Sequence, residues 1–337
     1  MTIPSKPITM TKGTGERLKD ALGSIIRARE FGIFAFLMLL SLLIGAFRPT
    51  FLSTDNLLNM GRQMAQTAIM AVAMTYLITA QELDLSVGSI FGFCTLGMGL
   101  LAKDFGQNLW LALVLALVVA ALIGLINGLI VTRGGIPAFI VTLGALYIVR
   151  GFTLLLSPWP VSGIQNPSFY KILAGQVWGI PVQIFWMLAI VIAGHLVLTR
   201  TTFGYYVRAT GSNRSAAGLA GVPVRRIKVL SFVLTAVAAA FAGALSFAHL
   251  TSVSPTAGGG LELQVIAAVV IGGTALFGGE GTVIGTLLGA ALLTVVRNGL
   301  VQLGGEGRLQ EAFLGAIIIF AVWIHTRLRS KGGGARL

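Results

Sequence analysis

The sequence predicts an all-α integral membrane protein with about ten transmembrane helices and both termini in the cytoplasm. Of its 337 residues, 55% are hydrophobic and only 10% are charged, and the mean hydropathy is +0.89. These values lie far outside the range of soluble domains. The apolar residues are gathered into runs of about 20, the length that crosses a bilayer core about 30 Å thick.

The apolar runs divide the chain into a polar N-terminal tail (1–30), a membrane domain (31–326) and a short C-terminal tail (327–337). No signal-peptidase-like site follows the first run, so we expect it to remain as a span. The expected spans are 31–47, 61–80, 86–102, 109–131, 136–156, 180–198, 229–249, 261–277, 281–303 and 309–325.

The distribution of Lys and Arg predicts the orientation. Seventeen fall in the two tails, in the 199–228 loop and at Arg133, on one side of the ten spans. The other side has four: Arg48, Lys103, Lys171 and Arg308. Because basic loops stay in the cytoplasm, the tails and the 199–228 loop are expected there. The same clusters account for the formal charge of +13 without a nucleic-acid partner.

An acidic turn, QELDLSVGS at 81–89, interrupts the apolar pattern between the second and third expected spans. Asp84 or Ser86 can cap the third span by accepting hydrogen bonds from its free amides. Alternatively the turn is a break that dips into the membrane and lines a pathway, with Glu82 beside it, because irregular backbone is tolerated next to a water-filled cavity. Glu280, in FGGEGT, is expected on the same side.

The long basic loop at 199–228 contains a predicted short helix through SAAGLA. Ser212 or Asn213 can cap it, and Gly221 and Pro223 end it. Two interpretations remain open: a solvated loop that sets orientation, or an exposed helix whose small side chains let another protein approach closely. The second long loop, 157–179, is expected outside, as an interfacial segment with aromatic anchors or as a docking surface.

Two glycine patterns predict close helix packing. Gly281, Gly285 and Gly289 fall on one face of the ninth span. GLING at 124–128 repeats the spacing and adds Asn127, which either bonds a neighbouring helix or faces a pathway.

Other function classes lack their signatures. The three histidines lie on different spans, with no metalloprotease or serine-hydrolase motif, so we expect neither an enzyme nor a metal site. No Walker A motif is present, so the chain cannot hold ATP by a P-loop. An ion-coupled carrier would need acids at mid-membrane, and Glu262 is the nearest case.

Three motifs together resemble the ribose-type sugar permeases of bacterial ATP-binding cassette (ABC) importers. They are LDLSVGS at 83–89, TFGYYVRATGSNRSAAGLAGVPVRRIK at 202–228 and IGGTALFGGEGTVIGTLLGA at 271–290. The resemblance extends over most of 31–325 and implies a multi-pass protein of the bacterial inner membrane. It implies a coupling helix that seats in a separate P-loop ATPase, formed by Ser215, Ala216, Ala217, Gly218 and Gly221. Ser215 stands where many importers have glutamate, which leaves one salt bridge to the ATPase open.

The function that this resemblance implies is a pathway for a monosaccharide or related polyol. An extracytoplasmic binding protein would deliver the sugar, a second permease copy or paralogue would complete the pathway, and the partner ATPase would use the ATP, so this chain needs no cofactor. The candidate pathway or gate residues are Glu82, Asp84, Ser86, Asn127, Gln264, Thr274 and Glu280, with Phe91, Phe93 and Phe139 as apolar walls. The alternatives are an ABC permease for a non-sugar polar solute and an ion-coupled carrier.

Overall fold

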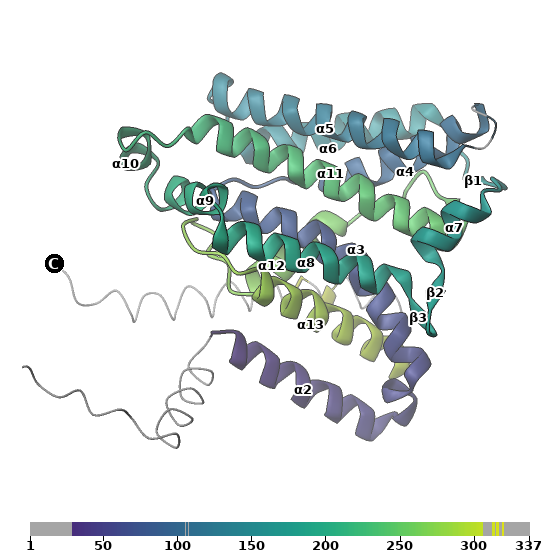
Figure 1. Ribbon diagram of the computed structural model, residues 1–337. Helices are drawn as coiled ribbons and strands as arrows, with labels where there is room; N and C mark the ends of the chain where they lie inside the picture. The colour runs from purple at the N-terminus through teal and green to yellow at the C-terminus, as the bar shows by residue number, and fades with distance from the viewer. Residues whose placement is uncertain are drawn as a thin grey trace, which may run out of the picture.

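A computed structural model of the protein describes residues 29–305 except 105 and 107, together with residues 312, 313, 315, 316 and 319. This part of the chain is a bundle of long helices lying roughly side by side (Figure 1). The long helices are α2 (Arg29–Phe47), α3 (Thr54–Thr79), α4 (Val87–Asp104), α5 (Leu109–Gly134), α6 (Ala138–Leu156), α8 (Val182–Arg200), α11 (Val224–Leu250) and α13 (Val283–Gln302).

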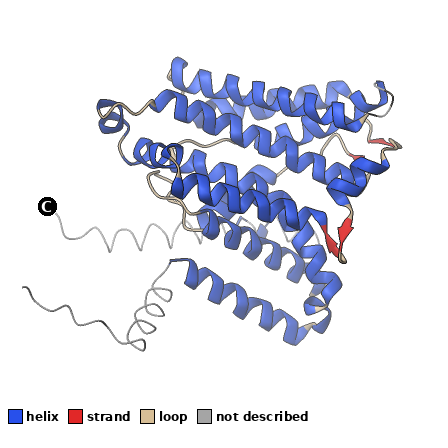
Figure 2. Cartoon of the chain, in the orientation of Figure 1, coloured by secondary structure: helices blue, strands red, loops and turns tan. Residues whose placement is uncertain are grey.

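The remaining elements are short and lie mostly at the two ends of the bundle (Figure 2). Strand β1 (Val161–Ser162) pairs antiparallel with β4 (Ser252–Val253), and β2 (Gln176–Val177) pairs antiparallel with β3 (Ile180–Pro181). The short helices are η1 (Pro49–Leu52), α7 (Pro167–Ala174), α9 (Thr202–Ser212), α10 (Arg214–Leu219) and α12 (Leu261–Ile271).

Each of the first nine expected spans overlaps a helix, while the tenth, 309–325, lies almost wholly outside the described residues. Six described helices are long and apolar enough to cross a membrane: α2, α5, α6, α8, α11 and α13. The prediction of an all-α integral membrane protein is confirmed at this level.

The eighth expected span, 261–277, is longer than the helix that the structure contains there. Helix α12 has 11 residues, about 16 Å at 1.5 Å per residue, and ends before Gly272. Gly273 follows with a positive φ of 89°, which a helix does not accommodate. The mostly apolar residues from 272 to Phe277 belong to a turn, 272–282, that joins α12 to α13.

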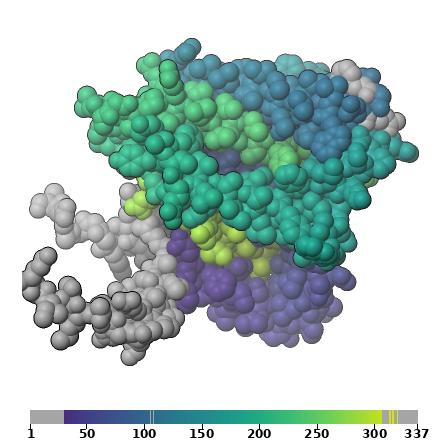
Figure 3. All heavy atoms as spheres, in the orientation of Figure 1, coloured from purple at the N-terminus to yellow at the C-terminus, as the bar shows by residue number. Residues whose placement is uncertain are grey.

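Helix α3 forms the centre of the bundle. From Thr67 to Thr79 every side chain is buried, because α8, α11, α12 and α13 pack around it. The more polar residues of α3 lie in its first half, 54–66, where most side chains are exposed or half-buried. Helix α2 is peripheral: Ile44 joins Phe51, Met60 and Val295 in a separate small cluster. Figure 3 shows α2, in purple, along the edge of the molecule beside α13.

The two ends of the bundle carry different elements. Helices α9 and α10 lie at one end, and α7 with the short strands lies at the other (Figure 1). The 157–179 segment, expected as a loop, contains the two-turn helix α7, which begins where Asn166 Oδ1 accepts a hydrogen bond from the amide of Phe169 at 3.2 Å.

The segment between β4 and α12 descends from that second end into the bundle. A Cβ atom added to Gly92 would collide with the carbonyl of Ala257, and one added to Gly88 would lie 2.5 Å from the carbonyl of Gly258. Non-helical backbone therefore lies against the first turns of α4. Such backbone is tolerated at depth because protein surrounds it.

A candidate coupling and gating site

Three segments that are distant in the sequence meet at the end of the bundle that carries α9 and α10. They are the α3–α4 turn (80–86), the 202–228 segment and the α12–α13 turn (272–282), and we call their meeting place the junction. The amide of Gly279 donates to the carbonyl of Thr79 at 2.9 Å, which ties the α12–α13 turn to the end of α3. The three segments lie within the three motifs described above or directly beside them.

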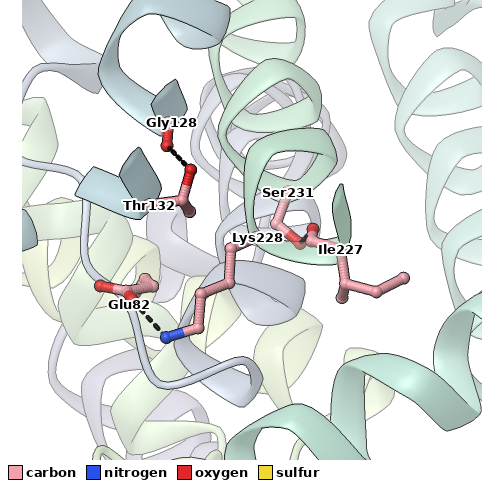
Figure 4. A network of polar contacts seen from close by, with 6 residues as sticks. All are labelled: Glu82, Gly128, Thr132, Ile227, Lys228 and Ser231. Atoms are coloured by element: carbon pink, nitrogen blue, oxygen red, sulfur yellow. Dashed lines mark hydrogen bonds and ion pairs between the residues drawn. The ribbon is translucent and has the colours of Figure 1, made fainter. Parts of the chain in front are cut away.

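A buried ion pair links the α3–α4 turn to α11. Lys228 Nζ lies 2.5 Å from Glu82 Oε1, and the two side chains are only 5% and 12% exposed. Figure 4 shows the lysine reaching from the first turns of α11 to the glutamate on the turn. Nearby, Thr132 and Ser231 donate to carbonyls of their own helices, so these hydroxyls do not compete for the pair.

A second polar chain holds the start of α4. The amide of Ser86 donates to Asp84 Oδ1 at 2.7 Å, and the Ser86 hydroxyl donates to the same oxygen at 2.5 Å. The Ser86 hydroxyl in turn accepts from Asn127 Nδ2 on α5 at 3.0 Å. The structure thus gives Asp84 the amide of the residue that precedes α4, and it gives Asn127 a bond to that residue rather than an open position.

The charge state of Asp84 sets a prediction for Asp84→Asn. The residue is fully buried in the turn between α3 and α4, and this burial raises the pKa of its carboxyl to about 6. A raised folded-state pKa means that ionisation destabilises the fold, by an amount that grows as pH rises from the unfolded value near 4 to about 6 and stays above it. Asparagine keeps an oxygen acceptor for both Ser86 donors and removes the charge.

We therefore expect Asp84→Asn to unfold at a higher temperature than the wild type at pH 7.5, with the difference shrinking below pH 6. Thermal unfolding of the detergent-solubilised protein at several pH values measures this. Asp84→Ala is the matched control, because it removes both the charge and the acceptor and is expected to be less stable than Asp84→Asn at every pH. Equal stabilities of the two variants would contradict the capping role.

Helix α9 is seated on the end of α3 through a glycine. A Cβ atom on Gly211 would collide with the carbonyl of Thr79 and would lie 2.6 Å from the amide of Gly279. Gly278 adds a positive φ of 80° on the opposite side of this contact. Three backbones therefore approach one another directly, without intervening side chains.

The short helix α10 projects from this seat. Asn213, rather than Ser212, is its N-cap, accepting a hydrogen bond from the amide of Ala216 at 3.0 Å. The helix ends at Leu219, and Gly221 follows with a positive φ of 81°. The coupling candidates Ser215, Ala216, Gly218 and Gly221 are exposed and Ala217 is buried, while Leu219, 92% exposed, is the most exposed apolar side chain on α10.

The glycines of α13 also sit at backbone contacts. Cβ atoms on Gly285 and Gly289 would collide with the carbonyls of Gly272 and Ala268, so α12 and α13 pack at backbone distance. Gly281 precedes α13 and lies against the side chain of Thr79, within the junction, so the prediction that all three glycines share one helix face is wrong for Gly281.

The other candidate residues are divided between the junction and the interior. Thr274 is fully buried in the α12–α13 turn, and the carbonyl of Glu280 accepts from the amide of Ala275 at 3.0 Å to close that turn. Gln264 lies on α12 and accepts from Arg297 on α13 at 3.5 Å, outside the junction. In the part of the chain that the structure describes, no three His, Cys, Asp or Glu side chains gather as a metal site would require.

Three residues of the junction are not predictable from the sequence. Lys228 has the features of a loop charge, since nothing in the spacing relates it to a glutamate 146 residues away. Thr79 and Gly211 carry their contacts through the backbone, which leaves no signal in side-chain type. The turn-forming pair Gly278–Gly279 was the one available hint.

Comparison with known proteins identifies a family of transport permeases. Residues 56–322 match the family described as the branched-chain amino acid transport system / permease component. The ribose import permease protein RbsC of Bacillus subtilis is 38% identical over 268 residues, 79% of this chain and 83% of the relative. The probable ABC transporter permease protein YphD of Escherichia coli K12 is 36% identical over 98% of both chains. The L-arabinose transport system permease protein AraH of the same strain is 33% identical over 79% of this chain and 81% of its own length.

No solved structure matches the chain. The family match nevertheless covers well over half of the 337 residues, and the relatives are matched over most of their own length. This chain therefore belongs to the branched-chain amino acid transport system / permease component family and is a multi-pass protein of the bacterial inner membrane.

Proposed function

We propose that this chain is the permease subunit of an ABC importer that carries a monosaccharide or related polyol. The single observation that carries the mechanism is the junction, where an exposed helix, α10, is joined by buried contacts to the turns that end α3 and begin α13. The sugar is favoured over other solutes because ribose and L-arabinose permeases are among the relatives. The family description favours one alternative, an ABC permease for a non-sugar polar solute.

In the proposed mechanism the chain binds no ATP. A separate P-loop ATPase receives α10, a soluble binding protein delivers the sugar to the opposite end, and a second permease copy or paralogue completes the pathway. The positive-inside rule favours a cytoplasmic position for both termini and for α10. Residues 1–30 and 327–337 would then be cytoplasmic tails.

Movement of α10 has two routes to the gate. Along one, α9 carries Gly211, which rests on Thr79 at the end of α3. Along the other, α11 carries Lys228, which holds Glu82. ATP binding would bring the two ATPases together and shift α10, and both routes would then move the α3–α4 turn. Such alternation between closed and open states is a two-state switch driven from outside the chain.

The proposal is tested first by its partner. The tagged chain, purified from its native membrane in mild detergent, should bring with it a P-loop ATPase that mass spectrometry identifies. A chain that purifies alone and binds sugar or an ion unaided would favour the ion-coupled carrier instead.

Gly218→Arg then tests the docking of α10. Nothing lies within 4 Å of a Cβ atom at this exposed position, so the arginine fits the isolated chain. We expect normal membrane levels, loss of the co-purified ATPase and uptake reduced to background. Ser215→Ala, also on α10, is the matched control, because it changes an exposed side chain without adding bulk, and we expect it to keep the ATPase and the uptake. Unchanged uptake by Gly218→Arg would contradict the docking.

A further inference from the structure

We infer that the junction contains a binding site for a sugar on its way to the cytoplasm, in which Gln81 and Phe139 contact the ring; this inference rests on the proposed function. A cavity of about 310 Å³ opens beside the α3–α4 turn. Its walls come from this turn, from the start of α6 and from the α12–α13 turn, and they include Gln81, Glu82, Leu83, Pro137, Phe139 and Leu276. The volume is at the lower end of that of small-ligand sites.

The lining has the chemistry that a neutral polyol requires. The amide of Gln81 both donates and accepts hydrogen bonds, which matches hydroxyl groups that do the same. The Glu82 carboxylate is a further acceptor: Lys228 engages Oε1, and the second oxygen can serve a hydroxyl. Phe139 is 56% exposed and offers an aromatic face to the apolar side of a sugar ring. Glu82 is the one charged residue of the lining, and Lys228 already neutralises it. The lining therefore favours a neutral ligand over an anion or a cation.

The backbone of Gln81 is the independent observation. The amides of Gln81 and Glu82 donate to the carbonyls of Ile78 and Leu77, at 2.9 and 3.0 Å, so α3 ends in a Schellman motif. The residue at the left-handed position of that motif is usually glycine, yet here it is glutamine with φ of 64°. Strain of this kind gathers at functional positions. Glycine fits this backbone conformation better than glutamine does, and the residue that stands there lines the cavity.

The position of Glu82 connects the site to the transport cycle. The carboxylate borders the cavity and also holds Lys228, which lies on α11 and is the last residue of the 202–228 segment. A shift of α11 that loosens the ion pair therefore changes the polarity of the cavity wall. In this way the state of the ATPase would set how strongly the sugar is held before release.

Gln81→Gly separates the two roles of this residue. Glycine relieves the left-handed strain and removes the amide from the cavity, so membrane level and thermal stability should be equal to or above those of the wild type. Uptake of ribose or L-arabinose should fall about two- to tenfold, the range of one hydroxyl hydrogen bond. Gln81→Asn keeps an amide and tolerates the left-handed region, and it should retain most of the uptake.

Protection from labelling reports binding directly. Cys94, the chain's one cysteine, is buried, so Leu276→Cys supplies a single reactive thiol at the cavity and leaves Gln81 and Phe139 in place. In membranes with the complete importer, the sugar that the wild type imports should slow maleimide labelling of Leu276→Cys. Labelling of Tyr205→Cys, at a position on α9 that is 70% exposed, should not change.

The outcomes distinguish the site from the function on which it rests. Import by the wild type, with protection at position 276 and the expected order of Gln81 variants, supports the site. Import without protection overturns it, even if Gln81→Gly lowers uptake, because the glutamine then only shapes the turn. A wild type that imports neither sugar overturns the proposed substrate class itself.

Discussion

Lys228→Met is expected to destabilise the folded protein by about 1–3 kcal/mol, because the Glu82 carboxylate, only 12% exposed, loses its charged partner. Methionine preserves most of the apolar stem, so the loss would reflect the charge rather than packing. Thermal or denaturant unfolding of the purified protein measures the change. Uptake should fall with it, because the ion pair joins α11 to the α3–α4 turn.

The double variant Glu82→Gln/Lys228→Met is the decisive control. With both charges removed, no unpaired ion remains in the junction, and replacing a buried pair by neutral groups is often close to neutral for stability. We expect the double variant to recover most of the stability that Lys228→Met loses. Uptake should recover less, because the link between the two elements is absent. Stabilities of the single and double variants that agree within error would show that the pair is not coupled.

Gly211→Ala is expected to abolish uptake while leaving most helices intact. The added methyl group would overlap the carbonyl of Thr79 and approach the amide of Gly279, and these two backbone groups already share a hydrogen bond. Backbone atoms cannot turn aside as a flexible side chain can, so α9 must move off α3. Overpacking typically costs about 1–3 kcal/mol, and a backbone collision places this variant at or above the upper end.

Gly218→Ala is the matched control for that variant. It makes the same change in the same segment, but at a position with open space around it. We expect uptake by Gly218→Ala near the wild-type rate and uptake by Gly211→Ala more than tenfold lower at equal membrane levels, measured with the partner ATPase and binding protein present. Rates within twofold of each other would mean that the seat of α9 is not rigid.

The helices were largely predictable because the bilayer imposes one length on each apolar run. Where that constraint does not apply, prediction failed. Helix α12 ends at Ile271, although apolar letters continue to Phe277, because two glycines redirect a backbone that protein covers. The sequence TFGYYVRATGS has weak helix propensity and predicts a loop where the structure has α9. The N-cap Thr201 and the burial of Val207 and Gly211 stabilise this helix.

The candidate site was predictable only in its parts. Each of the three motifs was noticed because acids, glycines or a cap interrupt an apolar pattern. Their meeting depends on tertiary packing, since Lys228 and Glu82 or Gly211 and Thr79 have no sequence relation that a single chain reveals. Asn127 illustrates the difference: the sequence leaves two alternatives open for it, and only the fold shows its bond to Ser86.

The short helix α12 has a consequence for how the protein is made. At about 16 Å it cannot cross a hydrocarbon core of about 30 Å, and the backbone before it would be left without hydrogen-bond partners in lipid. It is thus a poor substrate for helix-by-helix insertion by the translocon. In the folded protein, α4 supplies the surface at Gly88 and Gly92 on which the segment before α12 lies. We therefore expect α12 to take its place during biogenesis after α4 has been inserted.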